Sequence, residues 1–452
     1  MGEMASHDTD EAPRAGEPAD DVDQVPSEGV GADPGRLLKM IEEVAEIGRG
    51  AAGISRLAFS KDEQSAHELV DIWLSDLGFH VRRDAIGNTI AELPGRDPSL
   101  PAIGLGSHLD SVPHGGRFDG VAGVVAAIEV ARMIVHGGIT LHHPLRVVAF
   151  AAEEGARFGE PCIGSKAVAG WWSTGSLDRI RDAEGVTAAE AMRSVSLRPE
   201  DVEECQWQSS DWAAFLELHI EQASVLETTR TRIGVVDTVS GSTRVAFSVH
   251  GQAQHSGGTP MSLRTDALAA ASEMVLFAER LANDPHYRGT RATIGRLDVF
   301  PNSITTIPGI VRFVLDVRDT DGPRQRKAAS EIVRGFQQLC ERRGVELDFD
   351  VIADTSPVVL PTWLREILME SSEKASVSYR VMASGAGHDS QIINSVVPAG
   401  MVFVPSKGGL SHVPEEWTSA TDLATGATVL FDSIGRLDAF LASLPKDTTN
   451  GQ

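Results

Sequence analysis

The sequence has few cysteines and no long hydrophobic run. Its three cysteines are scattered along the chain, at Cys162, Cys205 and Cys340. Such a pattern excludes a disulfide framework and a paired-cysteine metal knuckle, and it favours a reducing cytoplasm. The longest apolar segment, residues 121–135, is interrupted by Glu129 and Arg132. We therefore expect no membrane span, and no secretory signal because no apolar stretch follows a basic start.

Positive charge is also scarce. The 452 residues include 40 Lys and Arg against 64 Asp and Glu, a formal net charge of −24. A nucleic-acid partner is therefore not expected, because binding phosphates requires the opposite sign. Residues 1–33 are polar, acidic and rich in Pro and Gly, which predicts a disordered acidic tail; residues 446–452 are expected to form a short second tail.

What the sequence does contain is a regular alternation of helix and strand patterns. The alternation runs through residues 34–239 and predicts the first part of an α/β catalytic domain with a central mixed sheet. Residues 240–353 follow a β-α-β-β-α-β order, with one strand expected at 292–299, which is typical of a ferredoxin-like unit. The alternation then resumes over residues 354–445. The simplest interpretation is a split catalytic domain that carries an inserted α+β domain.

Two neighbouring acids follow the apolar run at residues 144–150, which is typical of a buried strand. Carboxylates such as those of Glu153 and Glu154 are costly to bury unless a cation or hydrogen-bond donor meets them. The pair is therefore either a solvated strand end or part of a site. If both side chains reach one site, the chain must leave strand geometry at residues 151–154, because adjacent strand residues point to opposite faces.

Other potential ligands occupy similar positions. His108 follows a predicted strand, and Asp119 precedes a predicted helix. His219 and His412 lie in comparable settings. Each histidine alone is more often an ordinary surface or hydrogen-bonded residue, but together with one or two glutamates they would suffice for two metals that share a carboxylate. A mixed nitrogen and oxygen set suits Zn²⁺, Mn²⁺, Co²⁺ or Ni²⁺. Six other histidines are expected to be structural: His80, His114, His136, His142, His143 and His250.

Seven motifs in this order resemble the hydantoinase/carbamoylase amidases of the M20 metallopeptidase clan. They are SHLDSVPHGGRFDG, AAEEGARFG, ELHIEQ, GQAQHSGGTPM, LDVRD, SGAGHDS and GGLSHVPEE. Members of that family include N-carbamoyl-L-amino-acid hydrolases, β-ureidopropionases and allantoate amidohydrolases. The resemblance extends over about residues 54–438. It implies two divalent metals per subunit, with Zn²⁺ the first choice, and a homodimer whose inserted domain serves as the dimerisation or lid domain.

The resemblance also implies a role for each ligand. His108, Asp119 and His219 would hold one metal, and Asp119 would bridge to a second metal that Glu154 and His412 complete. Asp110 resembles the acid that orients a ligand histidine in this family.

By the same resemblance, Glu153 is the general base that takes a proton from the attacking water and can pass it to the leaving nitrogen. His255 is the family's candidate for stabilising the oxyanion, and it would reach the site of the partner subunit. Arg318 resembles the guanidinium that binds a substrate carboxylate; the alternative is a salt bridge with Asp316 or Asp319. Gln222, Arg244 and His388 match positions that line the family's pocket.

The chain departs from the family pattern at several pocket positions. Thr305 stands where an asparagine is common, and Ser242, Ala223 and Gly258 also replace usual residues. All predicted metal ligands are retained. The sequence therefore predicts the chemistry better than the substrate.

The combined prediction is a cytoplasmic, homodimeric, dinuclear-metal amidohydrolase. It would act on a small carboxylate-bearing N-carbamoyl or related amide compound and release ammonia and carbon dioxide from a ureide. The alternatives are an M20-type dipeptidase or N-acyl amino acid deacylase, and a non-catalytic metal-stabilised binding protein. Hydrolysis by a serine or cysteine nucleophile has little support, because Ser107 has no apparent base and orienting group.

Overall fold

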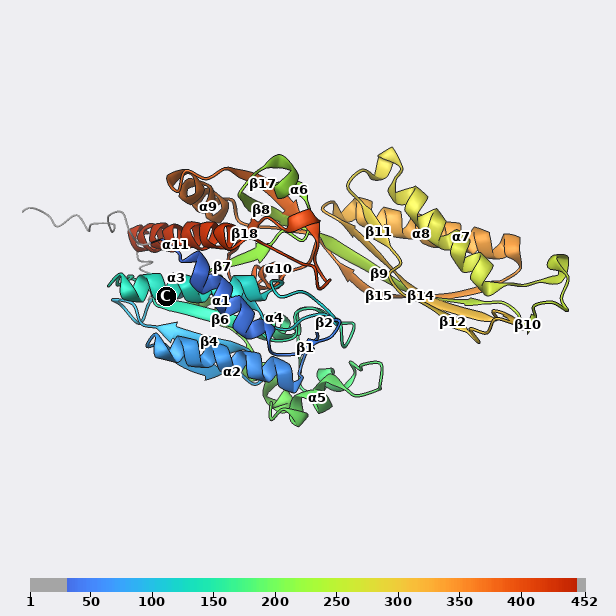
Figure 1. The fold of residues 1–452 in the computed structure, drawn as a ribbon, viewed down its shortest axis with the longest axis horizontal. Coiled ribbons are helices and arrows are strands. Elements are labelled where there is room, and N and C mark those ends of the chain that lie inside the picture. Colours follow the sequence, from blue (N-terminus) through green and yellow to red (C-terminus); the bar gives the residue numbers. More distant parts are fainter. Residues whose placement is uncertain (1–30, 445–452) are drawn as a thin grey trace, which may run out of the picture. The chain divides into compact units, whose positions relative to one another are not determined.

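The computed structural model describes residues 31–444 of the chain (Figure 1). The larger of its two main sheets has nine strands. Eight strands follow the order β16-β8-β18-β7-β5-β6-β4-β3, and β17 pairs with β8. The sheet is mixed, because β5, β6, β7 and β18 are parallel neighbours whereas β3, β4 and β16 pair antiparallel. The bounds are β3 His80–Arg83, β4 Thr89–Leu93, β5 Ala102–His108, β6 Leu145–Phe150, β7 Trp212–Ile220, β8 Ile233–Val239, β16 Val358–Val359, β17 Tyr379–Ser384 and β18 Ala399–Val404.

Helices cover both faces of this sheet. Alternate strand residues enter different clusters: Val147 packs with the helices of one face, and Val148 packs with those of the other. The first face carries α1 Pro34–Ala45, α2 Lys61–Asp76, α3 Val121–His136, α9 Thr362–Lys374 and α11 Ala420–Ser443. The second face carries α4 Ile163–Val168, α5 Ala188–Ser194 and α10 Asp389–Ile393. The predicted α/β class with a central mixed sheet is therefore confirmed.

A second sheet of five strands is entirely antiparallel. Its order is β11-β14-β9-β15, and β12 also pairs with β14. The bounds are β9 Gly241–His250, β11 Arg291–Thr293, β12 Leu297–Phe300, β14 Ile310–Asp319 and β15 Glu346–Thr355, with helices α7 Ala267–Ala282 and α8 Gly322–Arg343. Burial alternates along β9, because one face packs against α7 and α8 in a separate hydrophobic cluster around Phe336.

Within residues 240–353, the longer elements follow the predicted β-α-β-β-α-β order except in one place. The strand expected at residues 292–299 is two short strands, β11 and β12, which pair with different parts of β14. The remaining short elements are β1 Arg49–Gly50, β2 Gly53–Ile54, α6 Val225–Thr229, β10 Gln254–His255 and β13 Thr306–Ile307.

The predicted tails lie outside the described residues, apart from residues 31–33. There Asp33 accepts hydrogen bonds from the N–H groups of Gly35 and Arg36 and caps α1. Among residues 31–444, no helix has the length and apolar character needed to cross a membrane.

Candidate metal centre

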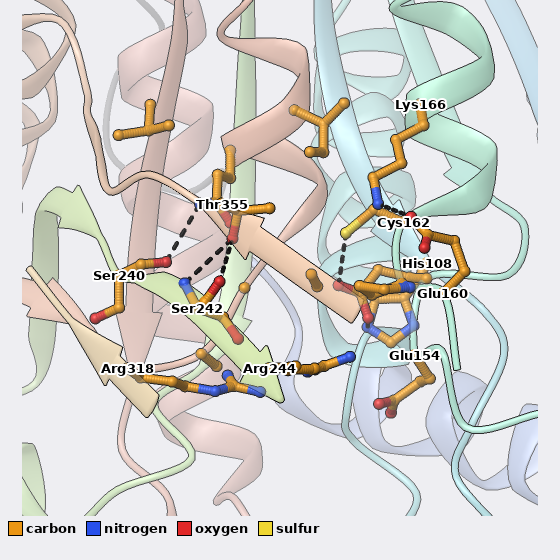
Figure 2. Close-up of a pocket in the computed structure, with 18 of the residues that line it drawn as sticks. His108, Glu154, Glu160, Cys162, Lys166, Ser240, Ser242, Arg244, Arg318 and Thr355 are labelled. Atoms are coloured by element: carbon orange, nitrogen blue, oxygen red, sulfur yellow. Dashed lines mark hydrogen bonds and ion pairs between the residues drawn. The ribbon is translucent and has the colours of Figure 1, made fainter. Parts of the chain in front are cut away.

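A cavity of about 720 Å³ lies where the carboxyl ends of β5, β6 and β7 meet (Figure 2). His108 ends β5, the two glutamates follow β6, and His219 is near the end of β7. Parallel neighbours bring their carboxyl ends to one edge of a sheet, which is where open α/β sheets bind ligands. The loop after β18 adds His412, so all five predicted metal ligands line this cavity.

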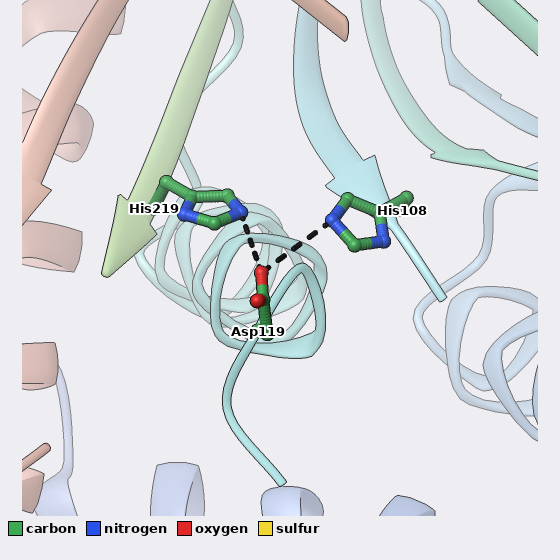
Figure 3. Close-up of side chains that lie close together, drawn as sticks. All are labelled: His108, Asp119 and His219. Carbon is green, nitrogen blue, oxygen red and sulfur yellow. Dashed lines mark ion pairs between the residues drawn. The ribbon is translucent and has the colours of Figure 1, made fainter. Parts of the chain in front are cut away.

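Asp119 lies between two histidines at one side of the site (Figure 3). One carboxylate oxygen, Oδ1, is 3.1 Å from His219 Nε2 and 3.7 Å from His108 Nε2. These three side chains are buried and form one group whose ligand atoms lie close enough for a single ion.

The other oxygen of Asp119 faces a second group. Oδ2 is 3.2 Å from His412 Nε2, which is itself 3.3 Å from Glu154 Oε2. Asp119, Glu154 and His412 form a further group that could hold an ion. The carboxylate of Asp119 is thus placed to bridge two ions.

The surroundings of the donors fit divalent metals. The Nδ1 atoms of His108 and His219 lie 3.2 and 2.9 Å from the backbone oxygens of Asp110 and Ile220, which leaves each Nε2 free to bind. Glu154 Oε1 is buried without a hydrogen-bond partner in the described chain. Contacts with the carboxylates of Asp119 and Glu154 raise the pKa of His412 to about 11. The two carboxylates therefore favour a positive charge beside them. A bound cation would supply that charge in place of the proton on His412.

The turn after β6 departs from strand geometry at Ala152, which has a φ of 56°. This agrees with the expectation from the two adjacent glutamates. Each backbone N–H of residues 151–154 donates a hydrogen bond to a side-chain oxygen. The acceptors are Asn88 Oδ1 for Ala151 (2.9 Å), Glu63 Oε1 for Ala152 (2.8 Å), Asp110 Oδ1 for Glu153 (2.8 Å) and Asp110 Oδ2 for Glu154 (3.1 Å).

The turn gives the two glutamates different surroundings. Glu154 faces His412, whereas Glu153 Oε2 is 3.7 Å from His108 Nε2 and Glu153 Oε1 accepts a hydrogen bond from Cys162 Sγ at 3.2 Å. Burial raises the pKa of Glu153 to about 7, and the negative charge of Glu154 contributes while His108 opposes the shift. A carboxyl group in this range can accept and return a proton near neutral pH.

Asp110 has a broader role than the sequence suggested. Its carboxylate is 3.4 Å from His108 Nδ1, and the same carboxylate holds the N–H groups of Glu153 and Glu154. One carboxylate therefore contacts both the candidate ligand His108 and the backbone of the glutamate turn.

Arg244 and Arg318 line the cavity across from His108 and Glu154 (Figure 2). Arg318 Nε donates to Asp316 Oδ2 at 3.0 Å, and Arg244 Nε lies 3.7 Å from the same oxygen. Ser242, one of the residues that departs from the family pattern, donates to Asp316 Oδ1 at 2.6 Å. The salt bridge weighed as the alternative for Arg318 is present, and its side chain still reaches the cavity.

The other predicted substrate residues have mixed positions. Gln222 lines the cavity, and its Nε2 donates to Asp119 Oδ2 at 2.8 Å. His388 is buried behind the cavity wall, where its Nε2 is 2.8 Å from Ser384 Oγ and its ring meets that of His219 edge-on. His388 is thus a neighbour of the candidate ligand His219, and the two form a further potential metal group with Glu217.

His255 is not brought to the metal ligands of its own chain. It is exposed, its Nδ1 accepts hydrogen bonds from the N–H groups of Gly257 and Gly258, and it does not line the cavity. Gly258, a departure from the family pattern, therefore lies next to the predicted oxyanion donor.

Sequence reasoning missed several residues around the site. Cys162 contacts Glu153, and nothing in its sequence setting indicated this. Glu63 and Asn88 are equally silent in the sequence. Glu416 could have been noticed, because it lies in the same motif as His412. Within the described chain, none of the six histidines expected to be structural lines the cavity or joins a potential metal group.

Comparisons with known proteins agree with this geometry. The model of peptidase family M20/M25/M40 matches residues 104–436. An N-carbamoyl-L-amino-acid amidohydrolase of Paenarthrobacter aurescens is 38% identical over 89% of this chain and 98% of its own length. The allantoate amidohydrolase of Bacillus subtilis is 33% identical over 89% of this chain and 97% of its own length.

A solved structure is similar over the same extent. The hydantoinase/carbamoylase family amidase of Burkholderia vietnamiensis has a TM-score of 0.84 and 32% identity, covering 91% of this chain and 99% of that one. These similarities confirm the family that the seven motifs predicted. The chain therefore belongs to peptidase family M20/M25/M40.

Proposed function

We propose that this hydrolase is a dinuclear-metal amidohydrolase that cleaves the C–N bond of a small carboxylate-bearing N-carbamoyl or related amide compound. The observation that carries the proposal is the Asp119 carboxylate, whose two oxygens face two separate groups of potential ligands. A ureide substrate would yield ammonia and carbon dioxide.

The two ions would share Asp119. His108 and His219 would complete one site, and Glu154 and His412 the other. When bound, the ions would supply Lewis-acid chemistry: they would lower the pKa of a water and polarise the carbonyl group whose carbon that water attacks. Zn²⁺ is our first choice for a site of nitrogen and oxygen donors; Mn²⁺, Co²⁺ and Ni²⁺ are the alternatives.

Glu153 would act as the general base. Its Oε2 is near His108 Nε2 but belongs to neither ligand group, so it is available to take a proton from the attacking water. It can then return that proton to the leaving nitrogen, which departs as ammonia or an amine.

Arg318 would bind the substrate carboxylate with its planar fork of donors, with Arg244 beside it. Gln222 would contact the substrate next to Asp119, to which its side chain is hydrogen-bonded. His388 would support the site indirectly, by packing against the ring of His219. Asp110 would keep His108 oriented.

We further propose a homodimer in which residues 240–353 form an inserted dimerisation or lid domain of ferredoxin-like type. His255 lies in this segment and away from the metal ligands of its own chain. In a dimer it would enter the partner's site and donate to the oxyanion.

The relatives support this function over the alternatives. They include amidohydrolases for N-carbamoyl-L-amino acids and for allantoate. The PepT aminopeptidase of Bacillus cereus, at 16% identity and a TM-score of 0.59, shares only the fold. A binding protein without turnover would have no use for a buried, unliganded acid such as Glu153. A cytoplasmic location remains our proposal, and the three free cysteines are compatible with it.

A substrate panel tests the proposal. Metal-loaded protein would be given N-carbamoyl amino acids, β-ureidopropionate, allantoate, dipeptides and N-acyl amino acids, with ammonia and amine release measured separately. We expect ammonia from at least one carbamoyl or ureide compound. Turnover of dipeptides or N-acyl amino acids alone would contradict the proposal.

A further inference from the structure

Glu416 is a buried acid outside the predicted ligand set. Its Oε1 accepts hydrogen bonds from the backbone N–H groups of Phe118 (2.8 Å) and Asp119 (3.0 Å). A Cβ at Gly116 would lie 2.4 Å from Glu416, so the loop encloses this side chain tightly. Glu416 thus holds the backbone of the bridging residue from the far end of the chain.

The second oxygen of Glu416 links the same loop to the segment of His412. Ser411 Oγ is 2.9 Å from Glu416 Oε2 and 2.8 Å from Asp119 Oδ2. One acid therefore contacts the Asp119 backbone directly and the Asp119 carboxylate through one hydroxyl, and that hydroxyl belongs to the neighbour of His412.

The two ligand groups depend differently on such support. The side chains of His108 and His219, at 2% and 1% exposed, extend from adjacent strands. His412 is 48% exposed and has a φ of 60°, a left-handed conformation that is uncommon for non-glycine residues. The group of Asp119, Glu154 and His412 is therefore the one that needs its loop fixed.

We propose that Glu416 is a positioning residue that fixes Asp119 and the His412 segment in one arrangement and thereby secures the second metal ion. The inference rests on the proposed two-metal site. It assigns Glu416 no contact with metal or substrate.

The chemistry of the contacts suggests a matched set of variants. Glu416→Ala removes all acceptors. Glu416→Gln keeps an oxygen for the two N–H groups, and its NH₂ can donate to Ser411 Oγ, which leaves the hydroxyl hydrogen for Asp119. Ser411→Ala breaks the link between the two carboxylates and also removes the hydroxyl that accepts from Gln222 Nε2 at 3.3 Å, while it leaves the Phe118 and Asp119 N–H groups bound to Glu416. Glu415→Ala is the control, because Glu415 is the adjacent acid and is exposed.

The first measurement uses the metal-free protein. Hydrogen exchange of a peptide spanning residues 116–121 reports the Phe118 and Asp119 amides without any ion. We expect faster exchange in Glu416→Ala, and wild-type exchange in Ser411→Ala and Glu415→Ala. Unchanged exchange in a folded Glu416→Ala variant would overturn the proposal that Glu416 fixes the backbone of Asp119.

The second measurement is a calorimetric titration with Zn²⁺ or Mn²⁺, with bound metal counted after dialysis. Loss of a residue that orients metal ligands typically weakens binding about 10–100-fold. We expect that loss for the second ion in Glu416→Ala, a smaller one in Ser411→Ala, and substantial recovery in Glu416→Gln. Equal weakening of both ions, or two tightly bound ions in Glu416→Ala, would overturn the inference. A wild-type chain that binds fewer than two ions would instead contradict the two-metal site on which the inference rests.

Discussion

The candidate metal ligands and the arginines that face them across the cavity are positioned by two different sheets. The ligands lie at or beyond the carboxyl ends of parallel strands, where topology brings distant segments together. Arg244 and Arg318 lie within antiparallel strands, and the register places Arg244 directly opposite Asp316 and Arg318 opposite Ser242. These four side chains meet as cross-strand neighbours on one face.

The two regions also differ in burial. His108 and His219 are almost fully buried, whereas the side chains of Arg244 and Arg318 are 23% and 29% exposed. The buried candidate ligands have fixed hydrogen-bond acceptors, which suits an invariant reaction. The partly exposed arginine side has room to accommodate different substrates. Of the departures from the family pattern, Ser242 lies on the arginine side and lines the cavity, whereas Ala223 follows β7 on the side of the candidate metal ligands.

The largest expected effect is at Glu153, the proposed general base. Glu153→Gln should lower kcat about 10²–10⁴-fold, the usual contribution of a general acid or base, while both metals remain bound. Glu154→Gln is the matched variant, and it should lose one metal because Glu154 faces His412. Elemental analysis and kinetics on the same preparations separate the two. Metal loss in Glu153→Gln, or unchanged turnover, would contradict the assigned roles.

The next effect concerns His255 in β10, which we propose acts in the site of a partner subunit. His255→Ala should lower kcat about 10²–10³-fold, as the loss of one oxyanion donor does. If His255 acts across a dimer, subunits of Glu153→Gln and His255→Ala, mixed in equal amounts, should recover about a quarter of wild-type activity, because half the dimers carry one intact site. Failure to recover activity after verified subunit exchange would argue against action in trans.

A smaller effect is expected at Arg318, one of the two arginines that line the cavity. Arg318→Ala should raise KM about 10–100-fold for a carboxylate substrate, which corresponds to losing a hydrogen bond to a charged group. It should change kcat much less than Glu153→Gln does. Arg312→Ala is the control, because Arg312 is an exposed residue of the same strand. Equal KM values for the two variants would remove Arg318 from the substrate site.

The smallest expected effect is on protein stability, at Glu63, which holds the backbone of the glutamate turn. Glu63→Ala leaves the buried N–H groups of Phe59 and Ala152 without their acceptor, which should destabilise the fold by about 1–3 kcal/mol. Asp62→Ala alters the adjacent exposed acid and should cost less than about 1 kcal/mol. Urea unfolding measures both. Similar stabilities for the two variants would mean that Glu63 does not support the glutamate turn.

Much of the fold followed from local patterns. Apolar alternation and helix periodicity predicted the α/β class of the larger domain and the longer strands and helices of residues 240–353, because each element buries one face. The exception was residues 292–299, where a continuous pattern became β11 and β12. A break of this kind depends on pairing with different parts of β14, which the segment's own residues do not specify.

The candidate ligands could also be named from the sequence, because several histidines and acids near predicted element ends are rarely all ordinary surface residues, and the structure brings all five to one cavity. The residues that hold them were not predictable. Glu416 binds the amide of Asp119 from 297 positions away in the sequence, and Asp110 binds that of Glu153 from 43 positions away. Hydrogen bonds across such distances leave no local pattern.

By itself, the sequence determined the donor types, their order along the chain and the departure from strand geometry after residue 150. Only the tertiary structure decided that the two oxygens of Asp119 face different ligand groups, that Glu153 is left outside both, and that His255 lies away from the site of its own chain. The physical reason is that residue chemistry is a local property. The direction in which a side chain points depends on backbone turns that distant residues hold in place.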